Sequence, residues 1–401
     1  MKRIPTLITY FVAVALVIFS ANTADAASGS ALIRNVVGTA SYTGPGGSGP
    51  LRAGLALGEG TTITTGAGSH VDIYMPNNGG IIRLEANSTV KFDTLRFRKL
   101  GAGSSFETNV NVTRGNVVAN VVKKLSRASR YQVRTPTGIA GIRGTSLRAG
   151  AGGLFTLTGT VNFTFNNGQV QLVIGGTILP VGSTSPIKAT QAQTTGLAQV
   201  AAGSTLNATG SAELVQQTLQ TFATAIAAQA AQDAGNENAA ATAAAVTKAV
   251  VQALVTAVQN AANELPPAQR ARVQQAVTAL NSQVQTIQAK AAANATVAAV
   301  ISNGGTPAQA QTAANQAADG ASTDAGARTA AKGQISRAVT AAQTGGSLAA
   351  MVDNVAAQTG PTPPPAGPGN APPPPPTTDT TLIPVTKDVQ ERQQNQTSPN
   401  N

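Results

Sequence analysis

Residues 131–148 read YQVRTPTGIAGIRGTSLR. From Tyr131 to Arg134, apolar and polar residues alternate, which is the pattern of a β-strand with one buried face. Pro136 and Gly138 then mark a tight turn, because proline fixes φ and glycine permits a positive φ. A second short strand follows. The stretch therefore predicts a β-hairpin that leads into a further turn.

This stretch resembles the FecR domain, named for the ferric-citrate regulator, whose characteristic run is V-x-T-P-x-G-x-x-x-x-R-G-T. The residues that match this run are Val133, Thr135, Pro136, Gly138, Arg143, Gly144 and Thr145. Residues 57–92 resemble the opening of the family, and residues 112–125 resemble its middle. The second half of the chain has no counterpart in this likeness.

Arg143 has two interpretations. A guanidinium offers five donors, so we expect it to tie irregular backbone together by satisfying carbonyls or a carboxylate inside the domain. Gly144 beside it allows a close approach of the backbone. The alternative is that Arg143 contacts a ligand directly.

The chain opens with the pattern of an export signal. A basic start at Lys2 and Arg3 precedes an apolar run over residues 7–19 and an Ala24-Asp25-Ala26 cleavage site. The apolar run is shorter than the roughly 20 residues that cross a bilayer. The chain has no cysteine, which excludes disulfides and lipid attachment through a thiol. We expect residues 1–26 to be removed, leaving a periplasmic or secreted protein without a transmembrane segment.

Positive charge is concentrated in one part of the chain. Residues 27–190 hold 16 Lys and Arg against 5 Asp and Glu, whereas the residues after 190 hold 9 and 10. Aromatic residues make up 3% of the chain, so few side chains could stack on nucleic-acid bases, and we do not expect a nucleic-acid partner. We expect a solvated basic patch, with an acidic polysaccharide, a lipid surface or an envelope protein as the alternative. The densest basic run is Lys123, Lys124, Arg127, Arg130 and Arg134.

Residues 27–186 show turn signals at roughly the 8–12-residue spacing of all-β domains. Between the turns, apolar and polar residues alternate, as in His70 to Met75. This pattern predicts a mainly β domain, either an irregular β-solenoid or roll or a sandwich. The resemblance to the FecR domain favours a solenoid or roll.

The rest of the chain differs in composition. Residues 187–210 are rich in Ser, Thr, Gly, Gln and Ala and are expected to be a linker. Residues 211–360 show apolar stripes at helical spacing and predict an Ala/Gln-rich helical module, either a spacer or a partner-binding module. The stripe in residues 266–303 has coiled-coil spacing, which suggests self-association through that helix. Residues 361–401 are Pro-rich and are expected to be a disordered tail.

The sequence offers little for catalysis. It has one histidine, His70, and no cysteine, which removes most zinc, thiol and Ser-His-Asp chemistry. His70 and Asp72 alternate on one strand, so we expect both side chains to point outward. No catalytic residue, metal site or cofactor is therefore expected.

Two functions follow from the resemblance. Regulators of this family carry a cytoplasmic segment and one membrane span, and this sequence shows neither pattern. We expect an exported, non-enzymatic binding or scaffold protein of the cell envelope. The alternative is a periplasmic signalling component that acts in trans on a membrane-bound regulator or transporter.

Overall fold

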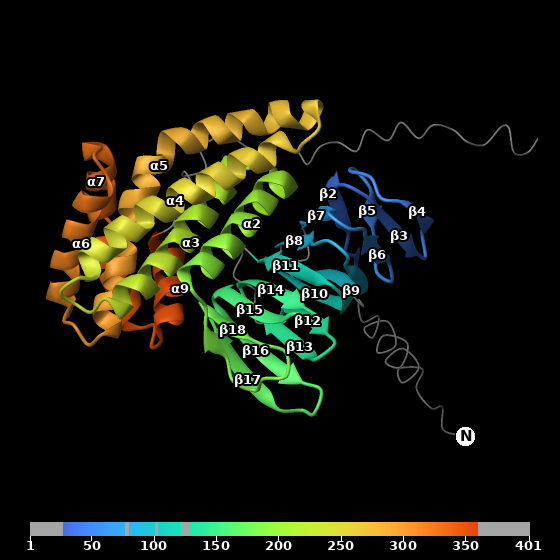
Figure 1. Cartoon of the computed structure of the whole chain (residues 1–401), viewed down its shortest axis with the longest axis horizontal. Helices are drawn as coiled ribbons and strands as arrows, with labels where there is room; N and C mark the ends of the chain where they lie inside the picture. Colours follow the sequence, from blue (N-terminus) through green and yellow to red (C-terminus); the bar gives the residue numbers. More distant parts are fainter. Residues whose placement is uncertain (1–26, 77–79, 101–102, 122–127, 360–401) are drawn as a thin grey trace, which may run out of the picture. The chain divides into compact units, whose positions relative to one another are not determined.

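Two β-sheets precede a set of helices in the computed structural model, which describes residues 27–76, 80–100, 103–121 and 128–359 (Figure 1). Sheet A has the strand order β17-β16-β13-β12-β10-β9-β6-β3-β4, with β1 paired to β9. Its strands are β1 (Ala27–Ser28), β3 (Ala40–Gly44), β4 (Gly47–Pro50), β6 (Thr62–Thr65), β9 (Thr89–Leu100), β10 (Gly103–Arg114), β12 (Arg130–Thr135), β13 (Gly138–Ile142), β16 (Thr160–Phe165) and β17 (Val170–Ile174).

Sheet B has the order β19-β18-β15-β14-β11-β8-β7-β2-β5. Its strands are β2 (Ala31–Val37), β5 (Ala56–Leu57), β7 (His70–Met75), β8 (Gly80–Leu84), β11 (Asn116–Asn120), β14 (Ser146–Gly150), β15 (Gly153–Thr158), β18 (Thr177–Leu179) and β19 (Ile187–Lys188).

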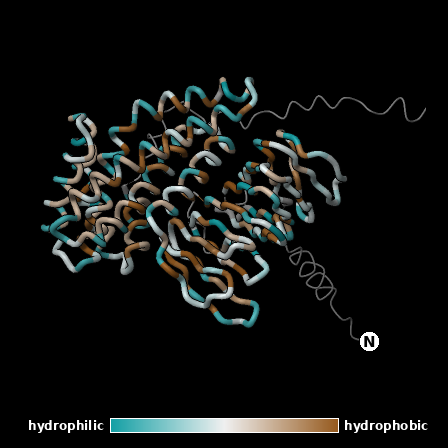
Figure 2. Tube along the Cα trace, viewed as in Figure 1, coloured by the Kyte–Doolittle hydropathy of each residue, from teal (hydrophilic) through white to brown (hydrophobic). Residues whose placement is uncertain are grey.

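The chain passes back and forth between the two sheets, one strand or one hairpin at a time. Buried aliphatic side chains of both sheets share one core, in which Ile33, Val71 and Leu147 of sheet B accompany Ile63 and Val133 of sheet A. In Figure 2, strongly hydrophobic stretches run along the strands. The prediction of a mainly β domain is confirmed. The two sheets form a sandwich around one core, while the winding of the chain between them is that of a roll.

Helices follow the sandwich, as predicted. The helices are α2 (Gln191–Thr209), α3 (Ala212–Asp233), α4 (Ala239–Asn263), α5 (Pro267–Ser302), α6 (Pro307–Ala321), α7 (Ala325–Lys332), α8 (Ile335–Gln343) and α9 (Leu348–Thr359). The apolar stripes expected from the sequence are buried: Val215 and Leu219 in α3, Leu254 in α4 and Leu280 in α5, the second, third and fourth of these helices.

The coiled-coil stripe of α5 packs inside its own chain. Val273, Val277, Leu280 and Ile287 are buried in one hydrophobic cluster with residues of α3 and α4. Self-association through residues 266–303 would therefore have to use another face of this helix.

The expected linker at residues 187–210 is wrong as a description of local structure. It contains β19 and the 19-residue helix α2. Thr190 caps this helix through reciprocal bonds with Gln193, and Gly210 ends it in the left-handed conformation with φ 63°. Its buried residues are mostly small and occur on several sides of the helix, so they leave no apolar stripe that a helical period would reveal.

Helix α2 covers the outer face of sheet B. It packs on β2, β7, β8, β11, β14 and β15, and α3 packs on β15 (Figure 1). Val118 of β11 and Leu157 of β15 belong to the hydrophobic cluster of these helices rather than to the sandwich core. The described residues up to Thr359 form one compact unit.

By length and composition alone, helix α4 could cross a membrane. The mean hydropathy of its most apolar window is 1.6. The sequence had suggested no such segment after the signal. Val250, Leu254 and Val258 of this helix are buried against neighbouring helices. Of the most apolar window of this helix, 39% is buried.

Candidate binding site

The hairpin read from the sequence is present. β12 and β13 pair from Tyr131 with Ile142 to Thr135 with Gly138, and the turn between them is Pro136 and Thr137. Val133 and Thr135 face the core, and the Thr135 hydroxyl donates to the Gly138 carbonyl at 3.1 Å. These motif residues build the hairpin, as expected.

Gly138 acts by another mechanism than the one expected. Its φ is not among the positive values of the chain. Instead, a Cβ atom at this position would lie 2.4 Å from the Thr164 carbonyl oxygen of β16. Gly138 is thus required because β16 approaches its backbone closely.

Arg143, Gly144 and Thr145 form the crossing from sheet A to sheet B. Gly144 takes a φ of 67°, which favours glycine, and the buried Thr145 hydroxyl donates to the Thr160 carbonyl at 3.3 Å. The Arg143 side chain is exposed, and within the described ranges it forms no hydrogen bond or ion pair. The preferred expectation, a guanidinium that ties the domain together, is wrong in this structure, because Gly144 and Thr145 shape the turn without it.

Basic residues gather on the outer face of sheet A. Asn111 of β10 lies between Arg134 of β12 and Lys91 of β9. In the same way, Glu107 of β10 lies between Arg130 of β12 and Arg96 of β9. We call Lys91, Arg96, Arg98, Arg130 and Arg134 the basic face; all five are exposed.

Ion pairs neutralise part of this face. Lys91 lies 3.2 Å from Asp93, and Arg96 lies 3.2 Å from Glu59. Arg98, Arg130 and Arg134 form no such pair among the residues that the structure describes. Of the basic run read from the sequence, Arg130 and Arg134 therefore lie on this face, whereas Lys123, Lys124 and Arg127 lie outside the described residues.

A cleft opens where the Arg143 crossing faces the helices. Its volume is about 440 Å³. Asn120 and Ser146 of sheet B lie at one side, Gln217 and Thr218 of α3 at a second, and Asn354 of α9 at a third. Arg143 and Asp353 also line it. Hydroxyl and amide side chains thus share the lining with apolar ones such as Val121 and Phe222, and one cation, Arg143, without a partner in the described ranges, lies among them.

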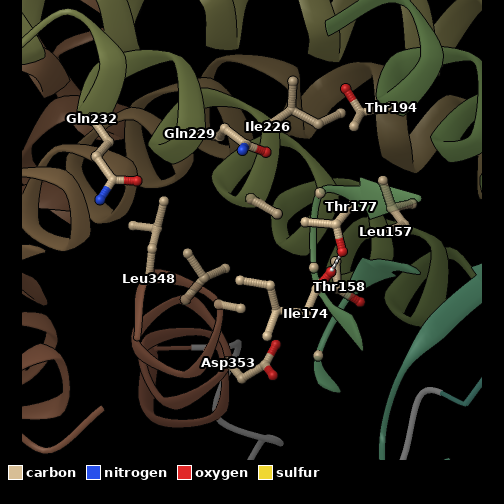
Figure 3. Close-up of a pocket in the computed structure, with 16 residues that line it drawn as sticks. Leu157, Thr158, Ile174, Thr177, Thr194, Ile226, Gln229, Gln232, Leu348 and Asp353 are labelled. Atoms are coloured by element: carbon tan, nitrogen blue, oxygen red, sulfur yellow. Dashed lines mark hydrogen bonds between the residues drawn. The ribbon is translucent and has the colours of Figure 1, made fainter. Parts of the chain in front are cut away.

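A smaller pocket of about 90 Å³ lies next to this cleft, because both are lined by Thr158 and Asp353 (Figure 3). Figure 3 shows Gln229 and Gln232 on one side, Leu348 and Asp353 of α9 on another, and Ile174 and Thr177 on strands of the sandwich. The line of contact between the sandwich and helices α3 and α9 is therefore hollowed at two neighbouring places.

A buried ion pair lies under helix α2. Asp72 is fully buried, and its two oxygens accept from Arg83 at 2.6 and 2.7 Å. Asn207 of α2 and Asn35 of β2 donate to the same carboxylate at 3.1 and 3.5 Å. Burial alone would raise the pKa of Asp72, but the Arg83 charge and these bonds outweigh burial and hold that pKa below its usual value. The expectation of an outward Asp72 is wrong, because α2 covers this face of the sheet.

His70 lies at the edge of the same cluster. Its Nε2 is 3.4 Å from Glu264, and its side chain is 18% exposed. Burial lowers the pKa of His70 and the Arg83 charge lowers it further, while Asp72 and Glu264 oppose this change. The expectation that His70 is an exposed strand residue is therefore wrong as well.

A second polar link joins sheet B to the same helix. Asn120 donates to the Thr205 hydroxyl at 2.9 Å and accepts from the Ser146 hydroxyl at 2.6 Å. Sequence reasoning missed these contacts, because polar residues on strands suggest a solvated face until the covering helix is known. In the described part of the chain, no three His, Asp or Glu residues lie close enough together to hold a metal ion.

One family model matches part of this chain. Residues 61–171 match the family model described as FecR protein. Two crystal structures of a protein described as a "putative anti-sigma factor" from Parabacteroides distasonis are similar at 17% identity, with TM-scores of 0.26 and 0.25. Each match covers 34% of this chain and 64% or 63% of the other, so the chain spans less than two thirds of their length. No curated protein matches.

Proposed function

From the FecR domain at residues 61–171, we propose that this chain is an exported, non-enzymatic binding protein of the cell envelope, and that its basic face binds an acidic polysaccharide. The observation that carries the proposal is the contrast between the two sheets. Helices cover sheet B, whereas the outer face of sheet A exposes Arg98, Arg130 and Arg134 without acidic partners among the described residues.

The spacing of these charges suits a polymer. The basic residues lie on β9 and β12, which flank β10, and neighbouring strands of a sheet lie about 4.8 Å apart. An acidic chain laid across the strands would meet several guanidinium groups in succession. Each exposed pair contributes little alone, so affinity would come from several contacts at once.

Export and the absence of catalysis belong to the same proposal. The signal pattern of residues 1–26 lies outside the described residues and supports export through its sequence alone. The lack of cysteine and the single histidine, His70, support a binding role rather than an enzymatic one.

The family match also favours a second function, a periplasmic signalling component that acts in trans on a membrane-bound regulator or transporter. In that case the basic face or the cleft would contact a protein. Co-purification from envelope extracts with a membrane regulator, at salt concentrations that abolish polysaccharide binding, would favour signalling.

Binding of immobilised polygalacturonate at low and high salt tests the first proposal. Replacing Arg98, Arg130 and Arg134 by Ala should weaken binding at least about tenfold, and salt should weaken wild-type binding because exposed charges are screened. A matched variant removes the exposed Arg52, Lys248 and Arg337 instead and should bind like wild type.

Three results would count against this function. Equal losses in the two variants would show that net charge, not the basic face, controls binding. Binding to phosphatidylglycerol vesicles but not to polygalacturonate would replace the polysaccharide by a lipid surface. Binding to neither probe would remove the proposal.

A further inference from the structure

Beyond the basic face, we propose that the cleft beside Arg143 binds a small sugar acid, a carboxylate with several hydroxyl groups such as galacturonate. The site is formed jointly by the FecR domain and helices α3 and α9. It lies against sheet B and the helices, not on the outer face of sheet A, so it can be tested separately from polymer binding.

Arg143 provides the anchor for the carboxylate. Its guanidinium lines the cleft and has no hydrogen-bond or ion-pair partner within the described residues. A guanidinium can form two parallel hydrogen bonds to one carboxylate, and these charge-assisted bonds are among the stronger ones in proteins. The turn does not need this side chain, since Gly144 supplies the positive φ and the Thr145 hydroxyl donates to the Thr160 carbonyl of β16.

Thr218 is a second, independent sign of a ligand. It is 4% exposed, lines the cleft, and its hydroxyl has no partner among the residues that the structure describes. One turn away, Thr221 donates to the Gln217 carbonyl at 2.9 Å, as threonines in helices commonly do. A buried hydroxyl without a partner is costly, and a ligand hydroxyl in the cleft would satisfy it.

The remaining lining is partly apolar, with Val121 and Phe222, and partly polar, which suits a sugar that has an apolar ring face and several hydroxyl groups. Gln217 and Asn354 offer amides that donate and accept, and the Asp353 carboxylate can accept from sugar hydroxyls. A volume of about 440 Å³ lies within the roughly 300–1,000 Å³ of ligand pockets. The lining holds one cation, Arg143, and one anion, Asp353, so the ligand carboxylate would lie at Arg143 and its hydroxyl groups at Asp353 and the neutral polar side chains.

Isothermal titration of the full-length mature chain with galacturonate tests the site, with galactose and acetate as the neutral and the hydroxyl-free probes. Wild-type protein should bind galacturonate more tightly than either. Arg143→Ala should weaken binding about tenfold or more, because a charge-assisted bond is lost. Arg143→Lys should recover part of the affinity, since a single ammonium cannot form the bidentate contact.

Thr218→Val removes the hydroxyl at nearly constant volume and should also weaken binding severalfold. Its control is Thr247→Val, since Thr247 of α4 is likewise buried with an unpartnered hydroxyl but does not line the cleft. Arg134→Ala, on the basic face, is one control for charge. Because Arg134 belongs to the basic face that is proposed to bind the polymer, the decisive charge control is Arg52→Ala, which removes an exposed guanidinium outside both the cleft and the basic face. Thr247→Val and Arg52→Ala should bind galacturonate like wild type.

The proposal would be overturned by any of four results: no binding of galacturonate at millimolar concentration, equal binding of galactose or of acetate, unchanged affinity in Arg143→Ala, or equal losses in Thr218→Val and Thr247→Val. A circular-dichroism melt of each variant confirms folding. Should Arg143→Ala fail to fold, the comparison of Arg143→Lys with wild type decides, and unchanged affinity there counts against the site.

Discussion

The side-chain amide of Asn207 in helix α2 donates to the Asp72 carboxylate of strand β7 at 3.1 Å, across 135 residues of sequence. This bond joins the segment expected to be a linker to the residue expected to point into water. The same carboxylate holds Arg83, so one buried cluster connects sheet B and its covering helix. The stability of the chain should depend strongly on this cluster.

Asp72→Ala should lower the free energy of unfolding by about 3–5 kcal/mol, because it leaves the buried Arg83 guanidinium without a partner. Urea denaturation of the mature protein measures this change. Asp93→Ala, which breaks the more exposed pair with Lys91, is the control and should cost less than about 1 kcal/mol. Equal effects of the two substitutions would contradict a stabilising role for the buried cluster.

Stability should fall as the pH decreases from about 7.5 to 5.5. Because the folded-state pKa of His70 is lowered, the unfolded chain binds this proton more readily, and stability declines as pH falls through the unfolded value of about 6.5 toward the folded one. His70 is the one histidine of the chain, so His70→Gln should flatten the profile in this range. A slope that persists in His70→Gln would show that another group titrates.

A second loss of stability is expected at more acidic pH. The folded-state pKa of Asp72 lies below its usual value of about 3.9, so its contribution is present above that value and is lost as pH falls through the folded one. Urea titrations of wild type and Asp72→Asn should converge in this acidic range. If the two proteins instead lost stability in parallel as the pH falls, a group other than Asp72 would be responsible for the loss.

A fragment of residues 27–186 should melt at a lower temperature than one of residues 27–210. Removing α2 uncovers Val118 and the Asp72 cluster, which this helix covers in the whole chain. The shorter fragment should still melt cooperatively, because the sandwich core includes no helix residue. Circular-dichroism melts of the two fragments measure this difference, and equal melting temperatures would show that α2 does not stabilise the sandwich.

Arg143→Ala should change the free energy of unfolding by no more than about 0.5 kcal/mol, since the side chain is exposed and unpartnered in the described structure. If Arg143 instead satisfied carbonyls or a carboxylate inside the domain, as the sequence led us to expect, the loss would be about 1–3 kcal/mol, the cost of leaving such groups unpaired. A thermal melt separates the two values. A marked destabilisation would restore the structural role of this guanidinium.

Local patterns of sequence predicted the parts of the fold that depend on local structure. Alternation placed Tyr131 and Val133 in the core, and the stripe of Val215 and Leu219 marked a helix that is present. Helix α2 escaped prediction because its buried residues, such as Ala201, are small and not confined to one stripe. Asp72 was misplaced for the same reason, since only the covering helix makes its face of the sheet an interior.

The candidate site was predicted only in part. The motif identified Arg143, but the sequence could not place α3 and α9 beside it, because these elements come from distant parts of the chain. Thr218 carries no signal in the sequence, since a threonine in a helix ordinarily bonds to its own backbone. Its missing partner becomes visible only once the packing is known.

The direct passage from β19 into α2 has a mechanical consequence. Only Ala189 and Thr190 separate the strand from the helix, and Lys188 also pairs with Asp233 of α3. The joint therefore has little compliance, and a pull or a twist on the helices is transmitted to sheet B. The sandwich and its helices would therefore rotate as one rigid body.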